Sequence, residues 1–386
     1  MADLAGGVGS TEPPGSGGGG FASAGAGRSG DPRIAEYARL IVGRCIGVQP
    51  GWTVNIRSTP LARPLIEAVM AEIGRAGAHV TLSLAFESYG GPWALAAPEE
   101  LLGEPSPVQA AIWQLSDAFI TIYAPENTRE GADLSSRRKA LFEQSLVPLR
   151  RRTMSMEVPW TIAEYPTAAT AQDAGMTLPQ LEEFVYGACL LDWDAEERRM
   201  RRIADRFDAA SEVRIVGDGT DVRISLEGRE GAIDDGRINM PGGEVFYAPV
   251  ETDVEGVVAF SEFPAVYYGR EVVGARLRFE GGKVVDASAD AGEDFLVATL
   301  DSDEGARRLG ELGIGCNPRI QRYTKNVGFD EKIDGTVHLA VGNAYAFVGG
   351  TNRSAVHWDL VKDLRTPESR IECDGEVVQA GGAWKI

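Results

Sequence analysis

The sequence predicts an α/β N-terminal domain at residues 31–207, followed by an α+β, turn-rich antiparallel C-terminal domain at 208–386. A chain of 386 residues is long enough for two domains with separate cores. Helix-like and strand-like segments alternate as far as Asp205, whereas short strands separated by Gly and Asp turns dominate from Glu212. The 44% hydrophobic and 25% charged residues are ordinary for a globular protein.

The predicted N-terminal domain alternates between helical and extended segments. Residues 34–45 and 65–75 have apolar residues at helical spacing, and the second helix ends before Gly77. Strands are predicted at 52–57, 80–84 and 118–123. Strand, helix and strand in short succession favour a parallel sheet.

Two helical segments lead to the predicted domain boundary. Thr177 and Gln180 have the spacing of a capping box, which predicts the start of a helix through Ala188. Its continuation at 195–207 is strongly charged and is interpreted as an exposed connector. Beyond residue 208, short strands are predicted at 213–216, 222–226, 245–248, 257–260, 275–279 and 283–287.

Composition restricts where the protein works and what it binds. Residues 1–30 are rich in Gly and Ser, lack the features of a secretory signal, and are predicted to be a disordered tail. The sequence has no run of about 18 apolar residues, so no membrane span is expected. Its four Cys form no CxxC pair, which suits a reduced compartment and predicts a cytoplasmic location. A formal charge of −19 argues against nucleic acid as a partner.

Two of the three histidines, His338 and His357, lie in a segment rich in acids and glycines. His357 and Asp359 are two positions apart, which places both side chains on one face of an extended strand. An imidazole and a carboxylate on one face form half of a site for a divalent ion. A buried histidine bonded to a neighbouring aspartate is the alternative, and the spacing leaves both interpretations open.

Two earlier glutamates are further candidates. Glu244 comes directly before a predicted strand. Glu311 follows 305–310, which is interpreted as a short helix whose last turn presents this side chain. Taken singly, each glutamate is more often a solvated surface residue than a metal ligand.

Taken together and in order, these segments resemble the thermophilic-type metallo-aminopeptidases, the family of aminopeptidases T and S and PepS-like enzymes. The resemblance spans nearly the whole chain beyond the tail and is strongest from Asn239 to the end. The motifs behind it are Asn239-Met240-Pro241 with Glu244, Leu309-Gly310-Glu311, Phe329-Asp330-Glu331-Lys332 with Gly335, Thr336 and His338, and Gly349-Gly350-Thr351-Asn352 leading to Ser354, His357 and Asp359. One departure is Cys316, which stands where a hydroxyl residue is expected.

The resemblance implies that residues 208–386 form a metal-binding catalytic domain with a dinuclear site. The two divalent ions would be Zn²⁺, Co²⁺ or Mn²⁺, and Glu311 would bridge them. Glu331 would be the catalytic carboxylate. A peptide with a free N-terminus would be the substrate, and a homodimer would enclose the site. The six implied metal ligands are Glu244, Glu311, His338, Tyr345, His357 and Asp359.

The charges of this ligand set agree with two ions. Two divalent ions bring four positive charges, and three carboxylates with one hydroxide bring four negative charges. Glu331 would then transfer protons as a general base and acid. A salt bridge with Lys332 or a nearby arginine is the alternative role for Glu331.

Two other functions fit parts of the pattern. His338, His357 and Asp359 match the two-His-one-carboxylate triad of non-haem Fe(II) enzymes, and ring-cleaving dihydroxypyridine dioxygenases resemble this peptidase fold. Glu244 and Glu311 argue against this function, because they would overcharge a single dication. A catalytically silent binding protein should have lost some ligands, whereas every implied ligand position is filled.

Overall fold

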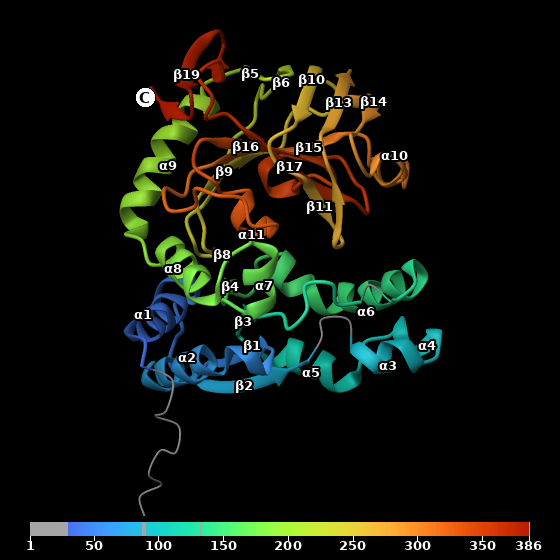
Figure 1. Cartoon of the computed structure of the whole chain (residues 1–386). Coiled ribbons are helices and arrows are strands. Elements are labelled where there is room, and N and C mark those ends of the chain that lie inside the picture. Colours follow the sequence, from blue (N-terminus) through green and yellow to red (C-terminus); the bar gives the residue numbers. More distant parts are fainter. Residues whose placement is uncertain (1–29, 87–89, 132, 386) are drawn as a thin grey trace, which may run out of the picture.

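The computed structural model describes residues 30–86, 90–131 and 133–385. The tail predicted at 1–30 therefore lies outside the described residues, apart from Gly30. Figure 1 shows helices around a sheet in the first part of the chain and a strand-rich second part. Helix α9 (Trp193–Asp208) runs along one side of the molecule from one part to the other.

A parallel sheet lies at the centre of the N-terminal part. Its strands are β1 (Thr53–Ser58), β2 (His79–Leu84), β3 (Ala118–Tyr123), β4 (Trp160–Glu164) and β8 (Asn239–Met240). Among the described residues the strand order is β2–β1–β3–β4–β8, and every neighbouring pair is parallel. The strands predicted at 52–57, 80–84 and 118–123 are confirmed. The edge strand β8 belongs to the segment that leads to Glu244, so this sheet helps to position a predicted site residue.

Helices surround the parallel sheet, and the apolar faces of the first two long ones pack against β1 and β3. The helices are α1 (Pro32–Leu40), η1 (Ile41–Ile46), η2 (Pro60–Ala62), α2 (Arg63–Arg75), α3 (Gly91–Ala96), α4 (Glu99–Leu102), α5 (Pro107–Leu115), α6 (Ser136–Met154), α7 (Ala168–Asp173) and α8 (Leu178–Cys189). Both predicted helices are confirmed, and the first continues as a π-helical segment, η1. No helix in the described part of the chain is long and apolar enough to cross a bilayer.

The predicted capping box is present at the start of α8. Gln180 Oε1 accepts a hydrogen bond from Thr177 N at 2.9 Å, and Thr177 Oγ1 accepts one from Gln180 N. The interpretation of 195–207 as an exposed continuation of this helix is wrong. This segment belongs to the separate helix α9, whose apolar residues recur at helical spacing and form one buried face despite the charged composition. That face joins the core of the C-terminal part through Met200, Ile203, Ala204 and Phe207.

Two antiparallel sheets dominate the C-terminal part. The first contains β5 (Glu212–Gly217), β6 (Thr220–Ser225), β10 (Val254–Phe260), β13 (Ala275–Glu280), β14 (Lys283–Ser288), β18 (Arg370–Cys373), β19 (Glu376–Ala380) and β20 (Ala383–Trp384). The second contains β7 (Ala232–Asp234), β9 (Glu244–Tyr247), β15 (Leu309–Gly315), β16 (Thr336–Gly342) and β17 (His357–Asp363). Over the described residues their orders are β14–β13–β10–β6–β5–β18–β19–β20 and β17–β16–β15–β9–β7.

Shorter elements complete the C-terminal part. A separate hairpin pairs β11 (Ala265–Tyr267) with β12 (Arg270–Val272). The helical segments here are α10 (Glu293–Leu300), α11 (Val327–Asp330) and η3 (Ala346–Val348). The large core of this part is formed by the apolar side chains of both sheets together with α9 and α10.

All six strands predicted beyond residue 208 are confirmed. The short helix predicted at 305–310 is wrong, because Glu311 lies inside strand β15. Every residue of β15 is buried, and three of its seven residues, in the sequence LGELGIG, are glycine. A strand buried on both faces shows no alternation of apolar and polar residues, so its pattern does not reveal a strand.

Candidate metal centre

Four neighbouring strands of the second antiparallel sheet hold five of the six predicted ligands. Glu244 begins β9, Glu311 lies on β15, and His338 lies on β16. His357 and Asp359 lie on β17, where two-residue spacing places both on one face. Because β9, β15, β16 and β17 are hydrogen-bonded in this order, residues more than a hundred positions apart come together on a rigid surface.

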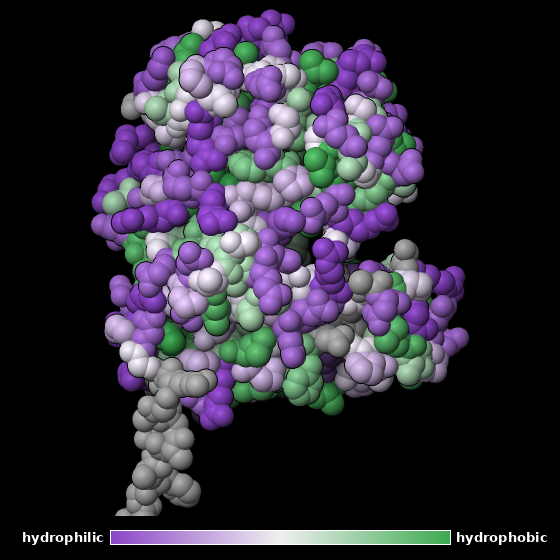
Figure 2. Space-filling model, viewed as in Figure 1, coloured by the Kyte–Doolittle hydropathy of each residue, from purple (hydrophilic) through white to green (hydrophobic). Residues whose placement is uncertain are grey.

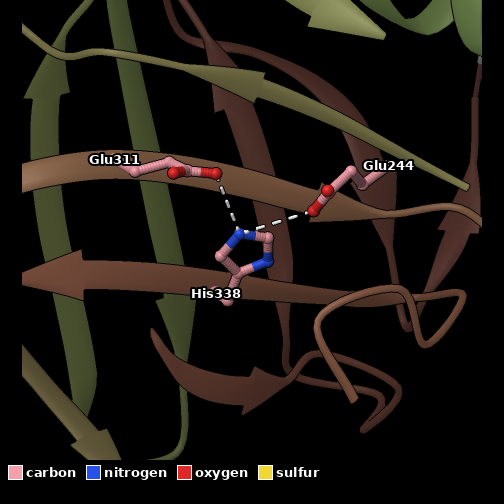
Figure 3. A group of neighbouring side chains, drawn as sticks. All are labelled: Glu244, Glu311 and His338. Carbon is pink, nitrogen blue, oxygen red and sulfur yellow. Dashed lines mark hydrogen bonds and ion pairs between the residues drawn. The ribbon is translucent and has the colours of Figure 1, made fainter. Parts of the chain in front are cut away.

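The side chains converge within a few ångströms. His338 Nε2 lies 3.2 Å from Glu311 Oε1 and 3.6 Å from Glu244 Oε2. Figure 3 shows both glutamates pointing toward the His338 ring from neighbouring strands. On the other side of Glu311, its Oε2 atom lies 3.4 Å from His357 Nε2. The same His357 nitrogen is 3.6 Å from Asp359 Oδ1.

These contacts form two groups of potential ligands that share Glu311. One group is Glu244, Glu311 and His338, and the other is Glu311, His357 and Asp359. Within each group the candidate ligand atoms lie within 4.8 Å of one another. A third group of the same size contains His338, Asp359 and Glu331, so the predicted catalytic carboxylate lies beside the predicted ligands.

The sixth predicted ligand, Tyr345, also lies at this cluster. It follows β16 in the loop before η3, and the centroid of its ring is 5.1 Å from that of His357. Burial raises the pKa of the Tyr345 phenol, and the charges of Glu311 and Asp359 raise it further. A phenolate at this position therefore needs a cation beside it.

Small residues make room for the large ones in this sheet. Gly313 lies directly opposite His338 in the pairing of β15 with β16, and Ala340 lies opposite Asp359 in the pairing of β16 with β17. A Cβ atom on Gly313 would overlap the imidazole ring of His338. The absence of a side chain at position 313 is thus what allows His338 to stand over β15.

Backbone carbonyls fix the orientation of both histidine rings. His338 Nδ1 lies 3.1 Å from the carbonyl oxygen of Glu331, and His357 Nδ1 lies 2.9 Å from that of Asn343. A carbonyl can only accept, so in each ring Nδ1 is the donor. Each Nε2 atom therefore faces the carboxylates, where it donates a hydrogen bond while protonated and would offer its lone pair to a metal ion that replaces the proton.

A fully buried lysine completes the cluster. Lys332 Nζ contacts Glu331 Oε1 and lies 3.4 Å from Glu244 Oε1 and 3.6 Å from Asp234 Oδ2. The alternative role suggested for Glu331, a salt bridge with Lys332, is therefore realised in the structure. One lysine is shared by three carboxylates, which leaves most of their negative charge uncompensated.

The electrostatics of the cluster fit a divalent cation. Burial raises the pKa of Glu244 well above its ordinary value, and the charge of Lys332 only partly offsets this. Burial alone would lower the pKa of His338, but the hydrogen bond to Glu311 and the nearby carboxylates outweigh it and raise the pKa to about 10. Within the described residues, Glu244 Oε2 and Glu311 Oε2 are buried and accept no hydrogen bond. Buried, unpartnered carboxylate oxygens beside oriented imidazoles are the donor set of a divalent metal.

The family model of the thermophilic metalloproteases (M29) matches residues 30–384. The chain belongs to this family. The resemblance inferred from the sequence is therefore confirmed. Aminopeptidase 2 of Geobacillus stearothermophilus is 28% identical to this M29 chain over 352 residues, which cover 82% of the chain and 84% of that relative.

Two solved structures share the fold of this M29 chain. Wild-type AmpT from Thermus thermophilus matches with a TM-score of 0.80 over 92% of this chain and 99% of its own, at 23% identity. 2,5-Dihydroxypyridine dioxygenase from Pseudomonas putida KT2440 matches with a TM-score of 0.60 over 91% of this chain and 96% of its own, at 14% identity. At these identities the matches show the fold alone.

Sequence analysis did not identify Asp234 as part of this M29 site, and it weighed Lys332 only as a partner of Glu331. Asp234 ends the short strand β7, which pairs with β9, and its place beside Glu244 arises only from this pairing. The residues Asn352 and Ser354 of the resemblance motif do not join the ligand groups. Asn352 Nδ2 donates to the carbonyl oxygens of Gly305 and Gly342, and therefore anchors the loop before β17.

Replacement of Gly313 by alanine is expected to weaken metal binding by roughly 10- to 100-fold, the usual effect of disturbed ligand orientation. The new methyl group would displace the His338 ring. Titration of Co²⁺ or Zn²⁺ against a competing chelator measures the change. Gly74→Ala is the matched control, since its Cβ would meet no atom within 4 Å. Equal affinities in the two variants would show that His338 is not held by this contact.

Proposed function

We propose that this M29 enzyme removes single residues from free peptide N-termini and uses two divalent ions to do so. Membership of the family and the aminopeptidase names of its relatives make the chain a metallo-aminopeptidase, a hydrolase. The number of ions and the free N-terminus are the proposal. The observation that supports two ions best is the sharing of Glu311 between two ligand groups.

In this proposal each group holds one ion and Glu311 bridges them. Glu244 and His338 complete the first site, and His357 and Asp359 complete the second, with Tyr345 beside it. Zn²⁺, Co²⁺ and Mn²⁺ all suit this mixture of nitrogen and oxygen ligands. When bound, two such ions lower the pKa of water and polarise the scissile carbonyl.

Glu331 is assigned the proton transfers. Its carboxylate lies close to His338 and Asp359. The side chain is 15% exposed, so it is largely shielded from bulk water but not fully buried. Contact with Lys332 limits the rotation of the carboxylate. Glu331 would accept a proton from the attacking water and deliver it to the leaving amine.

A cavity beside the second group provides a place for the peptide. His357 and Asp359 line a space of about 350 Å³ that continues between the parallel sheet and the β11–β12 hairpin. Figure 2 shows the surface hollowed on this side, between the N-terminal and C-terminal parts. The homodimer implied by the resemblance belongs to this proposal, in which a second copy would enclose the same space.

A ring-cleaving Fe(II) dioxygenase is the main alternative function. It is an alternative because 2,5-dihydroxypyridine dioxygenase shares the fold of this chain. His338, His357 and Asp359 supply its triad. Glu244 and Glu311 support the hydrolase instead, because two further buried carboxylates would overcharge a single dication. A catalytically silent binding protein would have no need to keep every candidate metal ligand, because burying their carboxylates costs free energy.

Metal-saturated protein is expected to contain two divalent ions per chain. The shared Glu311 provides ligands for both, so Glu311→Ala should reduce the content of both sites. Elemental analysis after gel filtration measures the stoichiometry. One tightly bound iron, with no second site, would contradict the dinuclear proposal and favour the dioxygenase.

Aminoacyl anilides with a free amine are expected to be cleaved after Co²⁺, Zn²⁺ or Mn²⁺ is added, and chelation should abolish cleavage. The same anilides with an acetylated amine should be inert, because an aminopeptidase recognises the free N-terminus. Release of the chromophore measures both rates. Equal cleavage of blocked and free substrates would leave a hydrolase but exclude an aminopeptidase.

Replacement of Glu331 by glutamine is expected to leave the metal content unchanged and to lower turnover by roughly 10²- to 10⁴-fold, the contribution typical of general acid–base groups. Glutamine keeps the size of the side chain but cannot accept the proton. Glu304→Gln, at an exposed turn residue of the same domain, is the control. Loss of metal together with turnover would instead identify Glu331 as a ligand, as the third ligand group permits.

A further inference from the structure

The cavity beside the metal centre has a second wall that comes from the parallel sheet. One wall contains His357 and Asp359 of β17. The lining also contains Glu164, the last residue of β4, and Asn326, which precedes α11. Glu164 therefore lies at the carboxyl end of a parallel strand, the edge at which open α/β sheets bind ligands.

Glu164 is a buried carboxyl group with little to compensate its charge. The residue is 8% exposed, and its Oε2 atom accepts one hydrogen bond, from Asn326 Nδ2 at 3.1 Å. Its other oxygen, Oε1, accepts none from the described residues, and no cation of that set lies within ion-pair distance of either oxygen. Burial raises the pKa of Glu164 to about 8. This carboxyl thus has free acceptor capacity next to a cavity.

Three other charged groups that line the cavity, Lys325, Arg129 and Asp330, already have partners. Lys325 Nζ forms an ion pair with Glu271 Oε1 at 2.8 Å. Arg129 Nη1 donates to the carbonyl oxygen of Gly269 at 3.0 Å. Asp330 Oδ1 accepts hydrogen bonds from the backbone and hydroxyl of Thr324. Lys325 and Arg129 are therefore engaged elsewhere, and neither forms an ion pair with Glu164.

We propose that Glu164 binds an ammonium group of the substrate, and this rests on the aminopeptidase function proposed above. A charge-assisted hydrogen bond is strongest where water is excluded, and it would offset the cost of a buried carboxylate. The ammonium group would be either the free N-terminus or the side chain of an N-terminal lysine. In the second case the lysine side chain would extend from the metal centre on the C-terminal sheet to Glu164 on the N-terminal sheet, whereas in the first case Glu164 would hold the amine next to the scissile carbonyl.

Glu164 also contacts Asn326, whose Oδ1 accepts a hydrogen bond from Gly328 N at 3.0 Å and so caps α11. Since α11 leads directly to Glu331, a purely structural role for Glu164 has to be separated from ammonium binding. Glu164→Gln separates the two roles, because the amide oxygen of glutamine still accepts from Asn326 Nδ2 whereas its charge is lost. The matched control is Glu157→Gln, an exposed carboxylate of the same part of the chain that pairs with Arg152.

The first measurement is steady-state cleavage of leucine and lysine p-nitroanilides by the metal-loaded enzyme. Glu164→Gln is expected to raise KM about 10- to 100-fold, the effect of losing one hydrogen bond to a charged group, with kcat changed less than about threefold.

The second measurement needs no turnover. Calorimetry on chelator-treated protein compares leucinamide with 4-methylpentanamide, which lacks the amine. Wild-type protein should prefer leucinamide, and Glu164→Gln should show no preference, while Glu164→Asp should recover part of it.

The outcomes distinguish the sources of the ammonium group. A higher KM for both anilides identifies the N-terminal ammonium, and a higher KM for the lysine anilide alone identifies the side chain. An unchanged KM and an unchanged preference for leucinamide would overturn the proposal, as would a fall in kcat alone, which indicates the structural role. If wild-type protein cleaves neither anilide, the aminopeptidase function fails, and the amide comparison still decides whether Glu164 binds an ammonium group.

Discussion

The burial of several carboxylates around one histidine is the constraint on which the C-terminal part of the structure depends. Glu244, Glu311 and Asp234 are buried, and the cations that face them are Lys332 and, when protonated, His338 and His357. A carboxylate buried without a partner costs several kcal/mol, so this arrangement is stable only with additional positive charge.

The sheet achieves this with small residues at chosen places. Gly313 leaves the space that the His338 ring occupies, and Ala340 lies opposite Asp359. Backbone carbonyls then orient both imidazoles without using any further side chain. Five of the six candidate ligands therefore lie on regular strands and only Tyr345 lies in a loop, and a site on such elements is better preorganised for chemistry.

The two parts of the chain contribute different functions to one cavity. The antiparallel sheet provides the charged centre, whereas the parallel sheet provides Glu164 and receives β8 from the segment before Glu244. The fold is also that of a dioxygenase, so the architecture by itself does not decide the reaction. Under the proposed function, the buried carboxylates Glu244 on β9 and Glu311 on β15 are what favour the hydrolase.

The sequence by itself indicated the family, because several motifs occur in the family's order, and it predicted nine of the strands that the structure contains. It also singled out Glu244, Glu311, His338, His357 and Asp359 as ligand candidates, of which only the His357–Asp359 pair has a recognisable local spacing. It gave the wrong element for Glu311, since a glycine-rich strand buried on both faces has no alternating pattern. It also misjudged 195–207, whose charged composition hides one apolar helical face. Only the tertiary structure placed Asp234 and Lys332 beside Glu244 and brought Glu164 to the cavity that His357 lines. These positions depend on strand pairing and domain contact between distant segments, and local sequence patterns contain no information on either.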